Sequence, residues 1–435
     1  MKKNIFLYLI FLILPLFAFS QVKSDSKAAY GKPVKKIEII GLQQTKKYVV
    51  TRELVTKVGE PCLEKNLKKD YARLDILDIF SEILIKPRLD KDSVVVSYKF
   101  VETFHFLPVV AVQINDENGI SAGGGLKMPN LFGRDIYLSA RALFGGATTI
   151  EVTVEQPWVT WRRAGYRFDY FHRDRLNKGA DFQEIADEMY LKLFANYSEN
   201  TKFGIHYDFI ILNSDKVGKT LSPDNKDHVF RSGIFIAFDT RDAYMDTRNG
   251  WWNEISYNRE MKIFKSNSNF HQIDIDIRRY IPLKWDRQSF AMFSLLTLRT
   301  GDIGKDIADW QQFNLGGTNT VRGWQFAYHR GKNQFVNTLE YRYTLIKPRL
   351  VRLPFHFNIK TGFQMALFAD YGAVWDQKNQ FAANNFLTGY GIGFRFFMPI
   401  VGMLRLDVGW GQKGEGAFIH LGSFEKPVIT RRRVR

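Results

Sequence analysis

The feature that most constrains the fold of this chain is a long series of segments in which apolar and polar side chains alternate. The series runs from Phe104 to Phe424 and contains no apolar stretch long enough for a membrane-spanning helix. Alternation with a period of two is typical of strands that face two different environments. Segments of roughly ten residues also match a tilted crossing of a bilayer. The pattern therefore predicts a transmembrane β-barrel, and a large soluble β-sandwich or propeller is the alternative.

The number of segments supports a closed barrel. Sixteen can be counted, at 104–115, 119–128, 134–145, 147–156, 164–174, 186–198, 201–213, 229–238, 252–263, 267–280, 286–300, 332–345, 358–373, 386–398, 402–411 and 416–424. An even number returns the chain to the side on which it started, as an antiparallel barrel of this class requires. Long connections at 175–185, 214–228, 301–331 and 374–385 all follow odd-numbered segments, which predicts long loops on one side of the membrane.

Composition and charge limit the classes of molecule that this chain is expected to bind. The chain is 15% aromatic, and its formal charge is +17, or +15 without the two lysines near the N-terminus. Such a charge fits nucleic acid, anionic lipid or acidic polypeptide. The N-terminal segment has the pattern of an export signal, and an exported protein is not expected to bind nucleic acid. Outer-membrane lipids and a charged lumen are therefore the expected explanation of the positive charge. A single cysteine, Cys62, excludes an intramolecular disulfide framework and a cysteine-based metal site.

The first twenty residues have the pattern of an export signal. Two lysines precede an apolar core at 5–17, and Ala18-Phe19-Ser20 forms a small-x-small cleavage site. We expect residues 1–20 to be a signal peptide and residues 21–32 to be a linker. No cysteine follows the cleavage site, which argues against a lipoprotein anchor. These features predict a protein of the Gram-negative outer membrane.

Residues 33–103 differ from the rest because helical and strand patterns are mixed there. The expected elements are a strand at 34–39, a helix at 51–58, a helix from Glu60 to Leu77, and strands at 83–88 and 93–101. This order resembles a POTRA domain, and Ile39-Ile40-Gly41-Leu42 matches the end of that family's first strand. The resemblance implies a periplasmic module whose sheet edge binds unfolded or client polypeptides, with lipoproteins as possible partners. The alternative is a small α+β module with no client role.

Further motifs occur in the same order as in a known barrel family. They are Asn130-Leu131-Phe132-Gly133-Arg134, Asp239 to Asp242 with Asp246 to Gly250, Val321-Arg322-Gly323-Trp324, Phe368 to Gly372, Gly391 to Arg395 and Leu404 to Asp407. Together they resemble the barrel of the BamA/TamA outer-membrane assembly superfamily, also called the bacterial surface antigen family. The resemblance implies a short member with a single POTRA-like domain at 33–103, a barrel at 104–424 and a basic tail at 425–435.

The resemblance also implies a position for the long insertion at 301–331. In the family this surface loop folds into the barrel, and its arginine pairs with acidic groups on the inner wall. Here that arginine is Arg322, with Asp370 as its partner and Glu340 as a second candidate. A bidentate arginine–carboxylate pair is stronger in a partly desolvated lumen than at a surface. The alternative is a surface loop with an exposed arginine. The other residues of the expected clasp are Val321, Gly323, Trp324, Gly316 and Gly317.

Two more sets of residues follow from the family. The turn between the eighth and ninth strands carries the motif residues Asp239, Thr240, Arg241, Asp242 and Gly250. The last strand has the pattern of an outer-membrane insertion signal, with Gly416, Phe418, Leu421 and Phe424. In the family the first and last strands pair weakly, and the opened seam can template a client strand. The glycine-rich stretch 119–125 lies on the second strand, so a weak seam near it is a hypothesis.

Motifs for catalysis are lacking in the sequence. The eight histidines show no metal spacing, and no Gly-x-Ser-x-Gly motif occurs. The repeated glycines at 389–393 superficially suggest a phosphate loop, but no helix follows them, so we interpret them as glycines packed in the lumen. We expect no enzymatic activity, no cofactor and no metal.

The expected function is assembly and insertion of outer-membrane proteins, or translocation of polypeptides. A dedicated polypeptide-secretion transporter and an orphan barrel with a structural or lipid-related role are the alternatives. We expect the N-terminal domain and the C-terminal tail to lie in the periplasm.

Overall fold

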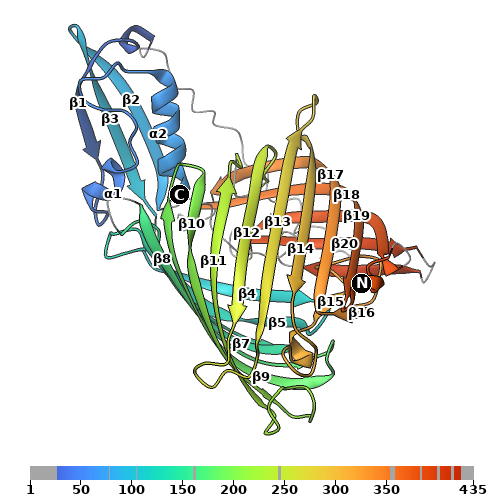
Figure 1. The fold of residues 1–435 in the computed structure, drawn as a ribbon. Helices are drawn as coiled ribbons and strands as arrows, with labels where there is room; N and C mark the ends of the chain where they lie inside the picture. The colour runs from blue at the N-terminus through green and yellow to red at the C-terminus, as the bar shows by residue number, and fades with distance from the viewer. Residues whose placement is uncertain are drawn as a thin grey trace, which may run out of the picture.

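A computed structural model describes residues 27–77, 79–103, 105–159, 163–242, 246–352, 358–382, 385–398, 402–412 and 416–422. The expected signal peptide, most of the linker, Phe424 and the basic tail lie outside these ranges. Figure 1 shows a small α+β unit placed at one end of a large barrel of strands. Within the described ranges, no helix is both long enough and apolar enough to cross a membrane.

The N-terminal unit is a three-stranded sheet covered by helices. Its elements are β1 (Val34–Ile40), α1 (Lys47–Thr51), α2 (Glu64–Ile76), β2 (Phe80–Asp90) and β3 (Ser93–Glu102). β3 is the central strand and runs parallel to β1 and antiparallel to β2. Apolar side chains from both helices and from β3 form its core, including Val49, Val50, Leu67, Leu74, Val94, Val96 and Tyr98.

Both helices of this unit start at positions that differ from the prediction. The first helix, expected at 51–58, lies at 47–51, because the Asp70 carboxylate accepts hydrogen bonds from the N–H groups of Val55, at 2.5 Å, and Thr56, at 3.4 Å. Those bonds hold the following segment outside a helix. The second helix starts at Glu64 rather than Glu60, because the Glu60 carbonyl accepts a hydrogen bond from the N–H of Val34, at 2.9 Å, which fixes it beside β1.

The barrel is one sheet of sixteen antiparallel strands, which confirms the predicted fold class. Its strands are β4 (Leu107–Asn115), β5 (Gly119–Leu131), β6 (Ile136–Gly145), β7 (Ala147–Gln156), β8 (Ala164–Asn177), β9 (Phe182–Asn196), β10 (Thr201–Ser214), β11 (Lys226–Asp239), β12 (Gly250–Glu260), β13 (Phe270–Pro282), β14 (Gln288–Arg299), β17 (Asn333–Arg352), β18 (Asn358–Trp375), β19 (Leu387–Met398), β20 (Gly402–Gly411) and β21 (Ala417–Gly422). Neighbours in the sheet are also neighbours in sequence, apart from the step from β14 to β17.

One stretch expected to be a long connection belongs mainly to strands. The 175–185 connection shrinks to a turn because β8 continues to Asn177 and β9 begins at Phe182. The 347–352 stretch is the end of β17, whose register shifts around Pro348. Proline has no N–H for the ladder, so a break in register is where a strand accommodates it. The insertion expected at 301–331 spans residues 300–332 and contains a short hairpin of β15 (Phe313–Leu315) and β16 (His329–Gly331).

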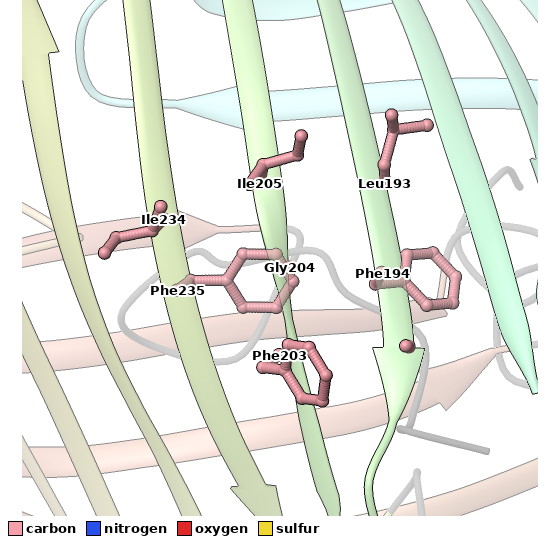
Figure 2. Close-up of a pocket in the computed structure, with 8 residues that line it drawn as sticks. Leu193, Phe194, Phe203, Gly204, Ile205, Ile234 and Phe235 are labelled. Atoms are coloured by element: carbon pink, nitrogen blue, oxygen red, sulfur yellow. The ribbon is translucent and has the colours of Figure 1, made fainter.

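The outer wall of the barrel is apolar, as contact with lipid requires. Exposed side chains alternate with buried ones along β10 to β12, so that Phe203, Ile205 and Ile234 face outward. A shallow hollow of about 520 Å³ lies on this wall, and Figure 2 shows the residues that line it. It is lined by Leu193, Phe194, Ala195, Phe203, Gly204, Ile205, Ile234 and Phe235, none of which carries a polar side chain.

The N-terminal unit is fixed to one end of the barrel, called here the docked end. The turn between β5 and β6 makes the main joint, where the N–H of Lys46 donates to the Gly133 carbonyl at 2.8 Å. A Cβ on Gly133 would lie 2.0 Å from the Gln44 carbonyl oxygen, so only glycine fits here. Arg52 binds Asp135 at 2.8 Å, and both side chains are largely buried. The opposite end, which carries the 300–332 insertion, is the loop end.

Candidate functional site

The 300–332 insertion enters the barrel and crosses it. Near its start, the Trp310 ring N–H donates to Asp227 on β11 at 2.9 Å, and the Gln311 amide donates to Glu260 on β12 at 2.9 Å. Residues 316–324 then lie against β18, β19 and β20. The insertion is therefore anchored at two places on the barrel wall, and the second place holds Arg322.

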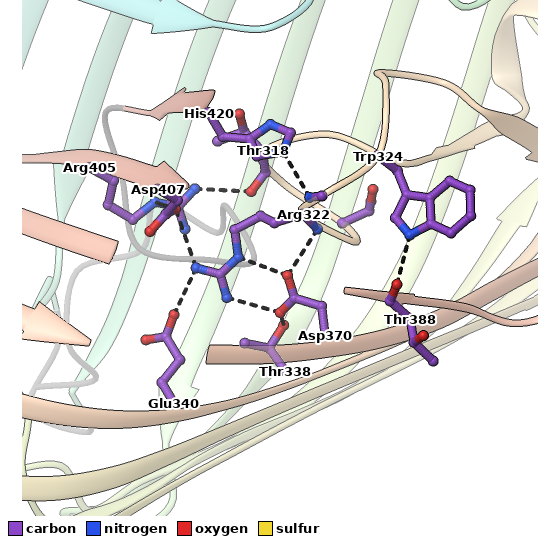
Figure 3. A network of polar contacts seen from close by, with 12 residues as sticks. Thr318, Arg322, Trp324, Thr338, Glu340, Asp370, Thr388, Arg405, Asp407 and His420 are labelled. Carbon is purple, nitrogen blue, oxygen red and sulfur yellow. Dashed lines mark hydrogen bonds and ion pairs between the residues drawn. The ribbon is translucent and has the colours of Figure 1, made fainter. Parts of the chain in front are cut away.

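Arg322 is fully buried and forms an ion pair with Asp370 of β18 (Figure 3). Its Nε donates to Asp370 Oδ2 at 2.7 Å, and Nη2 donates to Oδ1 at 2.9 Å. The backbone N–H of Arg322 donates to Oδ2 as well, at 3.0 Å. The hydroxyl of Thr338, on β17, donates to Oδ1 at 2.8 Å. The two guanidinium bonds form the bidentate geometry that arginine provides and lysine lacks. The backbone N–H adds a third bond to the same carboxylate.

Two further carboxylates face the same guanidinium. Arg322 Nη1 lies 3.1 Å from Glu340 Oε1 on β17 and 3.2 Å from Asp407 Oδ2 on β20. The Phe368 ring covers the guanidinium plane, with its centroid 3.5 Å from Cζ. The arginine is therefore held by carboxylates from three strands, β17, β18 and β20, and by one aromatic face, rather than by a single pair.

Three more arginines complete this buried cluster. Arg342 binds Glu340 at 2.8 Å, Arg395 binds the same carboxylate, and Arg405 lies 3.5 Å from Asp407. All of these side chains are almost fully buried. Each buried ion costs several kcal/mol of desolvation, which only close partners offset. Removing one member would leave charges unpaired, so the cluster holds the loop only while its members remain in place.

Glycines on the wall make room for the loop backbone. A Cβ on Gly389 would lie 1.8 Å from the Arg322 carbonyl oxygen, and one on Gly411 would lie 2.7 Å from the Gly323 carbonyl oxygen. Gly389 and Gly411 face each other across β19 and β20. The glycines at 389–393, interpreted from sequence as packed in the lumen, thus include one that receives the loop directly.

The remaining residues expected in the clasp lie around Arg322. Val321 and Trp324 are buried in an apolar cluster with Leu315, and the Trp324 ring N–H donates to the Thr388 carbonyl at 2.8 Å. Gly323 has φ +86° and sits so close to β20 that a Cβ would lie 2.4 Å from the Trp410 carbonyl carbon. Gly316 and Gly317 also have positive φ, of +104° and +94°, which side chains other than hydrogen rarely permit.

Sequence reasoning did not assign four residues of this cluster. Arg395, Arg405 and Asp407 fall inside two motifs that supported the family resemblance, but no role was given to them. Arg342 was not paired with any partner. The available signal was the presence of charged residues at inward positions of apolar strands, which is rare unless the charges are paired.

The turn motif at the docked end forms its own compact structure. Arg241 donates twice to Asp239, at 3.0 Å each, and stacks on the inward-facing Trp252. The Asp242 carboxylate accepts the Arg248 N–H at 3.0 Å. Gly250 has φ +116°, and a Cβ there would lie 2.3 Å from the Thr240 carbonyl oxygen. The motif therefore shapes the connection between β11 and β12 and does not contact the clasp through these bonds.

The expected insertion signal falls on both faces of the last strand. Gly416 occupies the turn before β21 with φ +95°, and Leu421 is exposed on the outer face. Phe418 shares the inward face with His420, and their rings stack at 6.2 Å. Phe424 lies outside the described residues. In the described part of the chain, no group of three or more His, Cys, Asp or Glu is placed to hold a metal ion.

Comparison with known proteins agrees with this architecture. The model of the Omp85 superfamily domain matches residues 130–420. The structure of BamA from Haemophilus ducreyi lacking POTRA domains 1-3 is similar, with a TM-score of 0.61 and 16% identity over 90% of this chain and 83% of that one. CdiB from Acinetobacter baumannii (TM-score 0.57, 16% identity, 92% and 72% covered) and CdiB from Escherichia coli (0.59, 12%, 89% and 75%) share the fold too. No curated protein sequence matches the chain.

Proposed function

The chain belongs to the Omp85 superfamily and forms an outer-membrane barrel, and we propose that it inserts or translocates polypeptides at that membrane. The observation that carries the proposal is the edge between β4 and β21. These strands are adjacent, yet within the described ranges no hydrogen-bond ladder joins them, whereas every other neighbouring pair has one. Unpaired backbone groups in a membrane are costly and readily accept another strand. A client polypeptide in extended form would satisfy both edges.

The N-terminal unit supplies a second strand-binding element in this proposal. Its sheet order places β1 and β2 at the two edges, and their exposed side chains include Ile40 and Leu89. An extended polypeptide can add to such an edge through main-chain hydrogen bonds. We propose that this unit acts as a POTRA-like domain in the periplasm and receives clients, with lipoproteins as possible partners. The joint at Gly133 would keep it beside the barrel mouth.

The barrel interior favours a second candidate, a dedicated transporter for secreted polypeptides. Charged side chains line the wall away from the clasp, including Lys192, Lys202, Glu254 and Arg278. Such a polar wall suits a hydrated path, provided that the 300–332 insertion moves out of it. In both candidates the energy would come from client folding or strand exchange, without a nucleotide or a metal.

Depletion of the protein followed by outer-membrane proteomics separates the candidates. If the protein assembles barrels, many barrel proteins are lost together. If it is a dedicated transporter, one secreted polypeptide disappears and the barrel proteins remain. An unchanged outer membrane would overturn both and leave an orphan barrel with a structural or lipid-related role.

A further inference from the structure

The seam between the first and last barrel strands is bridged by side chains. β4 ends at Asn115, and the next residue, Asp116, lies in the turn at the loop end. His420 is on β21 and points inward, almost fully buried. His420 Nδ1 lies 3.0 Å from Asp116 Oδ2. This contact joins β21 to the turn that follows β4, although the two strands share no backbone ladder in the residues the structure describes.

The other imidazole nitrogen binds the loop. The backbone N–H of Gly323 donates to His420 Nε2 at 2.9 Å, as Figure 3 shows. Because Nε2 accepts this bond, it carries no proton, and Nδ1 carries the proton that is donated to Asp116. His420 is therefore a neutral bridge of defined tautomer. One of its ends faces the first strand, and the other faces the residue that follows Arg322.

The loop also touches both sides of the seam directly. The backbone N–H of Thr318 donates to Asp116 Oδ2 at 2.6 Å, and its hydroxyl donates to the Leu421 carbonyl at 3.4 Å. The Thr318 carbonyl accepts from Arg405 on β20 at 3.0 Å. Burial alone would raise the pKa of the Asp116 carboxyl, but the hydrogen bonds from His420 and Thr318 hold that pKa below its ordinary value. Asp116 is thus an ionised acceptor shared by the last strand and the loop.

We propose that Asp116, His420, Thr318 and Gly323 form a latch that closes the seam through the loop. Opening the seam separates Asp116 from His420, and both residues hold the segment that carries Arg322. The seam and the Arg322 clasp are therefore coupled: the seam opens when residues 316–323 leave the wall, and it stays closed while Arg322 remains bound to Asp370. The latch goes beyond the proposed function, because it concerns how the barrel opens and not what passes through it.

The test measures the seam directly in the purified full-length protein without any client. Spin labels on Val110→Cys of β4 and Ile419→Cys of β21, in a Cys62→Ala background, report the distance across the seam in lipid nanodiscs. Both positions face outward and are 64% and 69% exposed, so labels there leave the lumen unchanged. His420→Ala and Asp116→Ala should each raise the long-distance population by about tenfold or more, because each removes the charge-assisted hydrogen bond between Asp116 and His420 together with one bond to the loop. The double variant should add little to either single one.

Matched variants make the result specific. His206→Ala removes another buried lumenal histidine, which binds Asn258 at 2.6 Å on a different wall, and should leave the distance unchanged. Arg322→Met should open the seam although none of the side-chain contacts of Arg322 described here reaches β4 or β21. If an alanine variant gives no heat-modifiable folded band, Asp116→Asn, which keeps the shape and removes the charge, takes its place.

Two results would overturn the latch. One is a seam distance like that of the parent in folded His420 and Asp116 variants. The other is a closed seam in Arg322→Met at the same time as trypsin shows the loop released. Disproof of the latch would not change the result expected from depletion and proteomics, so the two proposals can be rejected independently.

Discussion

The backbone carbonyl oxygen of Arg322 lies where the side chain of residue 389 would begin, since a Cβ on Gly389 would be 1.8 Å from it. The position of the loop therefore depends on a missing side chain as well as on charge. Arg322 reaches Asp370 with both backbone and side chain only because its own carbonyl can rest on β19. The close packing of the loop on Gly389 and the ion pair of Arg322 with Asp370 both hold the same segment, and each can be tested separately.

Gly389→Ala should expel the loop from the wall. The added methyl group overlaps backbone that cannot move without breaking the bonds of Arg322 to Asp370. We expect the folded barrel to become sensitive to trypsin after Arg322, a bond that is buried in the parent. Gly124→Ala on β5 is the matched control, because a Cβ there would meet only an ordinary contact at 3.7 Å. Equal resistance of both variants would contradict the close-packing account.

Arg322→Met and Asp370→Asn should destabilise the barrel to different degrees. Losing the arginine leaves buried carboxylates short of a partner, at a cost of about 3–5 kcal/mol. Losing the Asp370 charge should cost about 1.5–3 kcal/mol, because Arg322 keeps Glu340 and Asp407. The loss of stability in the double variant should be smaller than the sum of the two single losses, as is usual for residues that interact. Unfolding in guanidinium, followed by heat-modifiability, measures all three. Strictly additive costs would show that the pair does not interact.

A charge swap is a weaker test than this cycle. Placing aspartate at 322 would set it against Glu340 and Asp407, so the swapped pair would meet like charges even if Asp370 became arginine. The sequence suggested an isolated pair with one alternative acid. The structure has four arginines and three acids in contact, and that context determines which variants are informative.

The strands could be predicted from sequence because alternation is a local property. Each strand repeats with a period of two along its own residues, so neighbours in sequence are sufficient to find it. The cluster could not be derived in the same way, since Asp407 meets Arg322 through the pairing register of β18, β19 and β20. Register depends on hydrogen bonds between strands, and a shift of one residue would turn Asp407 outward. The family resemblance supplied Arg322, Asp370 and Glu340, whereas Asp407 and Arg395 required the structure.

Glu102 should make the joint between the two parts of the chain sensitive to acid. Its carboxylate accepts N–H bonds from Gln43, Gln44 and Thr45 at 3.0, 3.1 and 2.9 Å. Burial raises the pKa of Glu102, but these bonds and the Thr45 hydroxyl outweigh it and leave the pKa below 4.5. A lowered folded pKa means that the stabilisation is complete above pH 4.5 and is lost as pH falls through the folded value.

Hydrogen exchange measures that dependence. Protection of the amides of Gln43 to Thr45 should be lost in the parent as the pH falls through the lowered pKa of Glu102, and Glu102→Gln should be poorly protected at every pH. Glu82→Gln, at an exposed position on β2, should behave like the parent. Protection that is independent of pH in the parent would show that the carboxylate does not hold this segment.

Asp135→Asn should loosen the N-terminal unit from the docked end. The side chain of Asp135 is 1% exposed and bound to Arg52, so its charge is worth about 1.5–3 kcal/mol to docking. Glu64→Gln removes an exposed helix pair with Lys68 and should change docking by less than about 1 kcal/mol. Spin-label distances between α2 and β10 should broaden only in the first variant. Equal broadening in both would contradict a specific joint at Asp135.

The contacts of Glu102 and Asp135 at the joint between the N-terminal unit and the barrel could not be predicted from the sequence. The Asn130-to-Arg134 motif supported the family resemblance, but nothing in it indicated that Gly133 receives the N-terminal unit. The contact joins residues 44–46 with a turn almost ninety positions later, and it depends on a close backbone approach that leaves no side-chain pattern. Latch residues such as His420 and Asp116 are even farther apart in sequence.

The most direct test of the central claim is complementation in a depleted strain, with the outer-membrane proteome as the readout. The parent and Arg287→Met, which removes a half-exposed arginine at the docked end, should both restore the lost proteins. Arg322→Met should fail to restore them even when its folded, heat-modifiable band equals that of the parent. Full restoration by Arg322→Met at equal folded amounts would contradict the account, because the clasped loop would then be dispensable for handling polypeptides.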